Sequence, residues 1–580
     1  MTAPLCYDGV CKDSQDRQIE IFFKRLPARR DSAAHPNVFM LHGGPGLASA
    51  TLEPLMSALH ELLGGNVNVY TMDHRGTGRS SFLDCIAAQA QTSGSPLGYS
   101  VSAGEVASCA AELERHYGSD LSSFSITSAA LDLKTFISST LRNTSTFVYG
   151  LSYGTALAER LMQLQPSGVK GYILDGIATT AGADVEKFEY NSQWDRDFNE
   201  AGERFLQVCD ESYDDCGKYF KGSTASATLK TLLQKLDDAS FACTKLLDAL
   251  IADGSIEFPG LVKPSHVLRK LLGDLLESAQ DRLLIPILVF RLNRCSSDDR
   301  QVVEHFVNRQ FGGESGGDGG DDVMASDLIY KIISYSELWE QPTPSFDDME
   351  RRFLQSSIST GYQVETSTYC AFTKENSTAC KEYAQYASYN ASPIIYKRDR
   401  YWNRAPPLPN NVSVLLLGSL LDPQTIHKYA ETFYEALKTE NKKLVTFPHS
   451  PHGTIYGTPM MASSSGDEDN NDCGMLVLAS YVAQDGDLSK TDTSCVAKVR
   501  PISFALSRAT TKKLLATDVA FDGSFKAESD GEDESKDESS YKTLFFVFLG
   551  LFCMTLGAAI VGVIQWRREV LRNKIWSQIQ

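Results

Sequence analysis

Residues 146–154, which read Thr-Phe-Val-Tyr-Gly-Leu-Ser-Tyr-Gly, constrain the fold more than any other stretch of this chain. Strand-favouring residues run into the pattern Gly-x-Ser-x-Gly, and a helical pattern follows directly. This order predicts a strand, a sharp turn and a helix, with Ser152 at the tip of the turn on a strained backbone. Gly150 and Gly154 suit such a turn because a side chain on either would collide with the neighbouring strand or helix. The stretch therefore predicts an exposed nucleophilic serine, although an ordinary loop serine between two glycines has the same pattern.

Strand and helix patterns alternate on both sides of this stretch. The sequence predicts further strands at 37–41, 67–72, 172–174, 414–417 and 443–447, and helices at 52–63, 129–141, 156–164 and 424–437. Alternation of this kind predicts a mostly parallel sheet with helices on both faces, which is an α/β fold. From about residue 181 to about residue 400 the strand signal gives way to helical patterns, so we expect this part to be a large helical cap inserted into the sheet domain.

The C-terminal part of the chain differs in composition from the rest. Residues 522–540 are acidic and low in apolar content, which predicts a solvated stalk. The following run is apolar and uncharged, and it is long enough to span a bilayer. The predicted division is 1–180 for the first part of the core, 181–400 for the cap, 401–505 for the second part of the core, 506–543 for the stalk, 544–566 for a transmembrane helix and 567–580 for a tail. Basic residues in the tail place it in the cytosol and the large N-terminal part on the lumenal or extracellular side.

Cysteine usage points to an oxidising compartment. The chain has 13 cysteines, and setting aside Cys553 in the apolar run leaves an even number. No two cysteines have Cys-x-x-Cys spacing, so we expect disulfides and no metal. Four Asn-x-Ser/Thr sequons, at Asn143, Asn376, Asn390 and Asn411, agree with a secretory or cell-surface protein.

The first 20 residues are polar and include no cleavable signal peptide. One interpretation is a tail-anchored protein with residues 1–543 in the cytosol. The other is that a leading segment is missing from this sequence, and the cysteines, the sequons and the basic tail favour it. The net charge of −18 argues against a nucleic-acid partner. The run at 73–80 lacks the Gly-Lys-Ser/Thr ending of a phosphate loop, so we expect no nucleotide cofactor.

A serine hydroxyl becomes a good nucleophile only with a histidine base, and the imidazole needs a carboxylate to hold its tautomer. The strand at 414–417 leads to Asp422, and the next strand leads to His449 and His452. The glycine after His452 favours it as the base, since a small neighbour lets the loop approach the serine; His449 stays a rival. Asp422 could instead cap the following helix. The chain order of serine, acid and histidine is that of α/β hydrolases, so Ser152, Asp422 and His452 are the predicted catalytic residues.

The tetrahedral intermediate of such a reaction needs two preorganised amide donors. One should be the N–H of Tyr153, directly after the nucleophile. The other should come from the loop after the strand at 37–41, which reads His-Gly-Gly-Pro-Gly. We predict Gly44 as this donor, because glycine lets the backbone approach the substrate.

Several motifs together resemble one family. They are His-Gly-Gly-Pro-Gly at 42–46, Asp-His-Arg-Gly-Thr-Gly-Arg-Ser at 73–80, Gly-Leu-Ser-Tyr-Gly-Thr at 150–155, Asp-Pro-Gln-Thr at 422–425 and His-Gly at 452–453. In these the chain is similar to the prolyl iminopeptidase and tripeptidyl aminopeptidase family, over roughly residues 18–505. The segment from Cys473 to Cys495 resembles the C-terminal region of the tripeptidyl branch. Ile426, where the family commonly has proline, and the transmembrane anchor depart from its pattern.

The resemblance implies a secreted or surface serine exopeptidase, whose substrate is a peptide with a free N-terminus. It also implies that the cap restricts access and offers carboxylates to the substrate's ammonium group. Glu186, Glu189 and Glu200 are candidates, although the sequence favours a solvated helix face for all three. Two other classes stay open. A carboxylesterase or lipase would share every catalytic residue named above, and a catalytically silent adhesion module could use the same fold.

Overall fold

The computed structural model describes most of the chain before the predicted stalk. The described residues are 1–13, 15–30, 35–85, 100–141, 144–179, 181, 189–256, 258, 260–311, 324–461 and 471–526. The chain forms two units, Met1–Phe525 and Lys526–Gln580. The predicted transmembrane helix at 544–566 and the tail lie outside the described residues. Within the described ranges, none of the helices has the length and apolarity that crossing a membrane requires.

The first unit consists of short strands and many helices. The strands are β1 (Thr2–Pro4), β2 (Gln18–Glu20), β3 (Phe22–Leu26), β4 (Asn37–Leu41), β5 (Asn68–Asp73), β6 (Thr146–Leu151), β7 (Val169–Asp175), β8 (Ser413–Ser419) and β9 (Lys442–Phe447). The helices before β8 are α1 (Glu53–Leu62), α3 (Val106–Tyr117), α4 (Ile126–Thr140), α5 (Tyr153–Leu164), α6 (Trp194–Glu211), α7 (Ala225–Lys235), α8 (Ala242–Ala252), α9 (Pro264–Glu277), α10 (Leu284–Arg294), α11 (Ser297–Phe311), α13 (Asp327–Glu337), α14 (Phe346–Gln355), α15 (Thr366–Thr373) and α16 (Ala384–Ala387). After β8 come α17 (His427–Ala436), α18 (Cys473–Ala483) and α19 (Arg508–Leu515).

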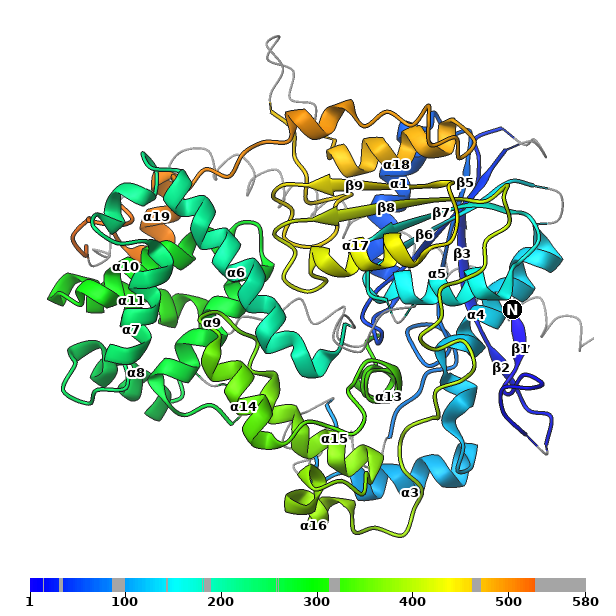
Figure 1. Ribbon diagram of the computed structural model, residues 1–580, viewed down its shortest axis with the longest axis horizontal. Helices are drawn as coiled ribbons and strands as arrows, with labels where there is room; N and C mark the ends of the chain where they lie inside the picture. Colours follow the sequence, from blue (N-terminus) through cyan, green and yellow to red (C-terminus); the bar gives the residue numbers. More distant parts are fainter. Residues whose placement is uncertain are drawn as a thin grey trace, which may run out of the picture. The chain divides into compact units, whose positions relative to one another are not determined.

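Seven strands form one sheet in the order β3-β5-β4-β6-β7-β8-β9 (Figure 1). The edge strand β3 pairs antiparallel with β5, and the other neighbours pair in parallel. The predicted mostly parallel sheet is thereby confirmed. Strand β6 lies in the middle of the sheet, parallel to both of its neighbours. The turn after β6 therefore lies at the carboxyl edge, where the loops of several strands converge.

Alternate residues of each strand enter separate cores on the two faces of the sheet. Phe39 and Leu41 of β4 pack with α4, α5 and α17, whereas Val38 and Met40 pack with α1 and α18. Strands buried on both faces read as continuous apolar runs, which explains why 37–41 and 414–417 were recognisable as strands. The helices on both faces were predicted from the same alternation.

Helices occupy the described residues between β7 and β8, from α6 to α16, and we call this part the helical insertion. Its helices α6–α11 share a second apolar core. Helix α13 instead contributes Leu328 and Ile332 to the core of the sheet domain. The insertion is thus attached to the sheet domain by buried apolar contacts as well as by its two chain connections.

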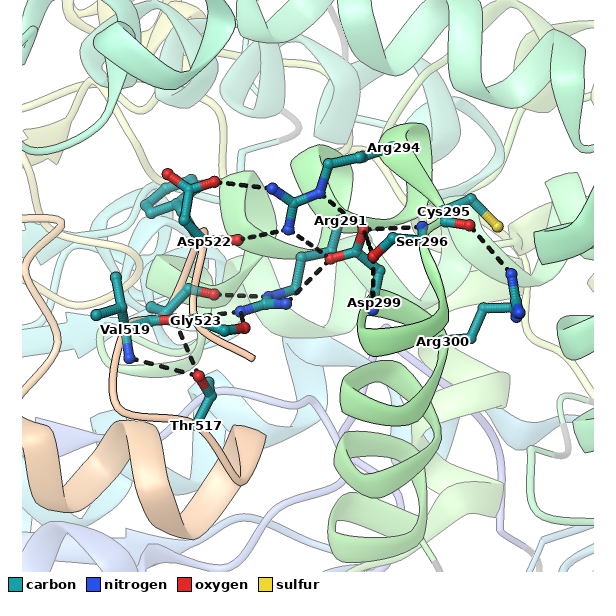
Figure 2. A network of polar contacts seen from close by, with 12 residues as sticks. Arg291, Arg294, Cys295, Ser296, Asp299, Arg300, Thr517, Val519, Asp522 and Gly523 are labelled. Atoms are coloured by element: carbon teal, nitrogen blue, oxygen red, sulfur yellow. Dashed lines mark hydrogen bonds and ion pairs between the residues drawn. The ribbon is translucent and has the colours of Figure 1, made fainter. Parts of the chain in front are cut away.

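The segment after residue 505 differs from the predicted stalk. Leu515 of α19 and Phe521 are buried in the core of the helical insertion, and the Phe521 ring stacks on Tyr219 with ring centroids 3.9 Å apart. Figure 2 shows Arg291 and Arg294 of α10 reaching this segment. Arg291 donates to the carbonyls of Val519, Ala520 and Gly523, while Arg294 pairs with Asp522. The prediction of a stalk from residue 506 is wrong for residues 508–525, because Leu515 and Phe521 bury their side chains in the insertion and Arg291 and Arg294 bind the residues around them.

The cysteines of the described residues are paired. The disulfides are Cys6–Cys11, Cys85–Cys109, Cys209–Cys216, Cys243–Cys295, Cys370–Cys380 and Cys473–Cys495. Three of them close loops inside the helical insertion. This pairing agrees with the expectation of disulfides, whose connectivity could not be derived from spacing.

Candidate active site

Ser152 lies in the sharp turn between β6 and α5. Its φ of 56° and ψ of −127° place a non-glycine residue on a strained backbone, and its N–H donates to the carbonyl of Asp175 at 2.9 Å. A Cβ on Gly150 would lie 2.3 Å from the carbonyl oxygen of Gly154, and one on Gly154 would lie 2.4 Å from that of Leu41. Both glycines are therefore required by close backbone contacts, as the motif predicts.

Asp422 and His452 meet on the loops that follow β8 and β9. Nδ1 of His452 lies 2.9 and 3.0 Å from the two carboxylate oxygens of Asp422. The carboxylate also accepts from the N–H groups of Gln424 and Thr425 and from the Thr425 hydroxyl at 2.7 Å. Asp422 thus holds its own loop as well as the imidazole. It does not cap the next helix directly, since α17 begins at His427.

The charge of Asp422 controls the titration of His452. Burial by itself lowers the pKa of His452, but the charge and hydrogen bond of Asp422 raise it, as do the charges of Asp175 and Glu277. The net result is a pKa above the ordinary value. An imidazole held in this way can accept a proton at Nε2 and keep the resulting charge stabilised by the carboxylate.

His449 occupies a different environment from His452. Its carbonyl accepts from Arg282 at 2.7 Å, and burial together with the charge of Arg282 lowers the pKa of its ring. The described residues that line the cavity around Ser152 include His452 but not His449. The geometry therefore distinguishes the two histidines, whereas the sequence favoured His452 but kept His449 as a rival.

A cavity of about 760 Å³ lies between the carboxyl edge of the sheet and the helical insertion. Ser152, His452 and Tyr153 line it, together with the whole 42–46 loop. In the described residues, the hydrogen bonds of the His452 ring go to Asp422 and Thr425, and none joins it to the Ser152 hydroxyl. Such bonds are often long in ligand-free enzymes and tighten when substrate binds. The structure thus brings the serine and the imidazole to one cavity.

The 42–46 loop and Tyr153, which carry the predicted oxyanion donors, line the same cavity as Ser152. The 42–46 loop packs against the nucleophile so closely that a Cβ on Gly43 would lie 2.7 Å from Cβ of Ser152. Gly44 has a φ of +118°, which favours glycine. Neither Gly44 nor Tyr153 uses its amide as a donor in the backbone hydrogen bonds among the described residues. These backbone bonds therefore leave both amides unassigned, and Gly44 and Tyr153 as oxyanion donors stay a prediction.

The three candidate carboxylates of the cap differ in their surroundings. Glu189 lines the cavity, is 3% exposed, and its Oε2 has no hydrogen-bond partner within the described part of the chain. Burial raises its pKa well above the ordinary range, and the charges of Asp197 and Asp422 raise it further. Glu200 lies away from the cavity lining and pairs with Lys428. Glu186 lies outside the described residues.

Two further carboxylates near the site were not selected from the sequence. Asp175 is fully buried at the end of β7 and accepts hydrogen bonds from the loop that carries His452. Glu277, at the end of α9, lines the cavity, and burial together with the charge of Asp274 raises its pKa to about 7. An acid at the end of the strand next to the nucleophile strand was a readable signal for Asp175. Glu277 had no comparable signal, because only the fold brings the end of α9 to this cavity.

Comparison with known proteins identifies the fold. Residues 36–262 match the family described as the alpha/beta hydrolase fold. The protein has an α/β-hydrolase fold. A search of curated proteins found no match. The described residues contain no group of three or more His, Cys, Asp and Glu side chains that could hold a metal ion.

Solved structures of several hydrolases resemble this chain at low identity. A proline iminopeptidase from Mycobacterium smegmatis is 13% identical, with 84% of this chain and 99% of that chain covered and a TM-score of 0.28. An esterase from Exiguobacterium antarcticum is 12% identical, with 74% and 89% covered and a TM-score of 0.26. A monoacylglycerol lipase from Paleococcus ferrophilus is 13% identical, with 74% and 91% covered and a TM-score of 0.25.

Proposed function

We propose that this protein is a serine hydrolase of the aminopeptidase type, which removes N-terminal residues or short peptides. His452 takes the proton of Ser152 as its oxygen attacks the scissile carbonyl, and Asp422 stabilises the imidazolium. The amides of Gly44 and Tyr153 stabilise the oxyanion. His452 then gives its proton to the leaving amine and activates the water that hydrolyses the acyl-enzyme.

The observation that carries the peptidase assignment is the position of Glu189. A buried carboxylate close to other carboxylates is unfavourable: burial and the charges of Asp197 and Asp422 raise the pKa of Glu189, and the opposing effects of Trp194 and Lys428 do not offset them. The ammonium group of a peptide N-terminus, placed against Oε2, would supply a close opposite charge and a hydrogen bond. Because Glu189 lines the same cavity as Ser152, one substrate can contact both residues.

A carboxylesterase or lipase is the second candidate. Much of the cavity wall is apolar, with Leu47, Leu52 and Leu55 on the sheet side and Phe198 and Leu338 on the insertion. Such a wall also suits an acyl chain, and ester hydrolysis would use the same catalytic residues. A silent adhesion module is the third candidate, and the contact between His452 and Asp422 beside a strained serine argues against it.

The test compares three substrates of similar size: a free-amine peptide with a chromogenic leaving group, the same peptide with an acetylated N-terminus, and a short acyl ester. We expect the free-amine peptide to be preferred, and Ser152→Ala to abolish turnover and fluorophosphonate labelling without unfolding the protein. Glu189→Gln should raise KM for the free-amine peptide by at least about tenfold, since it removes one partner of a buried charge pair, while ester turnover changes little.

Glu200→Gln is the matched control, because Glu200 is a carboxylate of the same helical insertion that pairs with Lys428 instead of lining the cavity. It should leave KM unchanged. If the free-amine and acetylated peptides are hydrolysed at equal rates and Glu189→Gln changes neither rate, the aminopeptidase assignment is wrong. The protein would then be an esterase or another hydrolase. If the wild-type protein is not labelled by fluorophosphonate and turns over none of the three substrates, the adhesion module is the remaining candidate.

The proposal includes a location. We propose a single-pass membrane protein of the secretory pathway or cell surface, with the hydrolase part lumenal or extracellular and a short cytosolic tail. The paired cysteines and the sequons support this assignment. Protease protection in intact microsomes tests it, since cleavage of the large part from the cytosolic side would contradict it.

A further inference from the structure

His74 lies in the motif at 73–80, to which the proposed mechanism assigns no role. It follows β5 directly and is 5% exposed. Its Nε2 lies 2.5 Å from the carbonyl oxygen of Pro45, and its Nδ1 lies 3.2 Å from that of Arg75. Its ring also packs against the ring of Tyr153, with centroids 5.5 Å apart.

These contacts join the two halves of the predicted oxyanion hole. Pro45 directly follows Gly44, whose amide is one donor, and Tyr153 carries the other. The two donors come from segments more than a hundred residues apart in the chain, at the ends of β4 and β6. A buried ring that touches both segments fixes the distance between them in a way that neither loop achieves alone.

We propose that His74 is a positioning residue for the oxyanion hole, acting through its hydrogen bond to the Pro45 carbonyl. This inference rests on the proposed serine hydrolase function. Both ring nitrogens face a carbonyl, which can only accept, and a neutral ring carries one hydrogen. We assign it to Nε2, because Nε2 is 2.5 Å from Pro45 whereas Nδ1 is 3.2 Å from Arg75. Burial lowers the pKa of His74, which keeps the ring neutral near pH 7 and leaves it a single N–H to donate.

Other contacts hold the rest of the 42–46 loop and the residues that follow it, up to Ser49. Gly46 accepts from the N–H of Ser326 at 2.9 Å, and Asp73 accepts from the N–H and hydroxyl of Ser49 at 2.7 and 2.6 Å. Removing the His74 bond should therefore not release the whole loop. It should loosen the Gly44–Pro45 region and displace one donor, which matters most where charge develops in the transition state.

Three substitutions separate the hydrogen bond from packing. The amide nitrogen of Gln reaches about as far as Nε2 and can donate to Pro45, whereas Asn ends at the position of Nδ1 and cannot. Leu fills the space of the ring without donating, and it serves where the smaller Asn prevents folding. We expect His74→Gln to stay within about threefold of wild-type kcat and His74→Asn and His74→Leu to lose about ten- to a hundredfold, with KM changed by less than about threefold.

His60 is the matched control. It is also 5% exposed, and its Nε2 contacts the Pro27 carbonyl at 3.0 Å, but it lies on α1 outside the cavity lining. The readouts are kcat and KM on the best substrate, the rate of fluorophosphonate labelling and the thermal midpoint. His60→Asn should lower the midpoint as His74→Asn does and leave kcat unchanged.

Each outcome decides the inference. Wild-type kcat in folded His74→Asn and His74→Leu would overturn it, and so would a His74→Gln variant as slow as these two. Equal loss of kcat in His60→Asn would overturn it as well, by showing a general effect of stability. A wild-type protein that fluorophosphonate does not label would overturn the proposed function, and this inference with it.

Discussion

The carboxylate of Asp175 accepts the backbone N–H of Thr454 at 2.8 and 2.9 Å, which fixes the loop carrying His452 to the strand beside the nucleophile. The same carboxylate accepts from the N–H of Ile455 and from the hydroxyl of Tyr149. The backbone carbonyl of Asp175 accepts from the N–H of Ser152. One residue thus connects the base loop and the nucleophile turn, and its charge adds to the field that raises the pKa of His452.

Asp175→Asn should lower kcat by about ten- to a hundredfold, because the amide offers one acceptor and turns a donor toward the loop amides. Burial raises the pKa of Asp175 to about 6, so the carboxylate is mostly ionised near pH 7. The variant removes this charge, and the acid limb of kcat/KM should move to lower pH. Measured pH profiles check both effects.

Asp195→Asn is the control for that variant. Asp195 is a buried carboxylate that also accepts several backbone N–H groups, from Gly361, Tyr362 and Gln363. It lies in the helical insertion and does not line the cavity. The Asp195→Asn variant should be less stable than wild type but show no shift of the pH profile. A shift of the same size in both variants would contradict a specific role for Asp175.

His452→Ala should reduce kcat/KM by about three to four orders of magnitude or more, because the serine then has no base. His449→Ala should stay within about threefold of wild type, since His449 neither contacts Asp422 nor lines the cavity and such substitutions usually have small effects. The two residues lie three apart in one loop, so each variant controls for the other. A large loss in His449→Ala alone would reverse the assignment of the base.

The rate should rise with pH through a pKa above the ordinary histidine value of about 6.5. His452 must be neutral to accept the serine proton, and its raised pKa keeps it charged to higher pH. Asp422→Asn should move this limb to lower pH, because only the smaller effects of Asp175 and Glu277 then oppose burial, and should lower the plateau about 10⁴-fold. Profiles of kcat/KM from pH 5 to 9 check this, with Ser152→Ala as the blank, and an unshifted limb in Asp422→Asn would contradict it.

The raised pKa of His452 also makes the stability of the fold depend on pH. Because the folded-state pKa of His452 is raised, its ion pair with Asp422 stabilises the fold fully below the unfolded-state pKa. This contribution is lost as the pH rises through the folded-state pKa. The protein should therefore be most active in the pH range where this particular pair contributes least to stability.

Arg291→Ala should destabilise the fold by about 1–3 kcal/mol, because the carbonyls of Ala520 and Gly523 lose their donor. Asp299 keeps its hydrogen bonds from Arg294 and Ser296. Arg300→Ala is the control: in Figure 2 Arg300 contacts the carbonyl of Cys295 and not that segment. Denaturant unfolding measures the difference. Equal stability of the two variants would show that the docked segment contributes little.

The sequence by itself determined the α/β class, the sharp turn at Ser152 and the order of the loops that carry Ser152, Asp422 and His452. These features are local: Gly150 and Gly154 are dictated by backbone contacts of one turn, and strands such as 37–41 are apolar throughout because both faces of the sheet are covered. Asp422 and His452 could be placed because each follows a recognisable strand at the carboxyl edge.

The tertiary structure decided what depends on approach between distant segments. It separated His452 from His449, placed Glu189 in the cavity while Glu200 pairs with Lys428, and brought Asp175 to the base loop and His74 to Pro45. It also showed that residues 508–525 pack on the helical insertion, which their acidic neighbours had obscured. Burial and charge at these positions are properties of the fold, since they arise from contacts between residues that no local pattern connects.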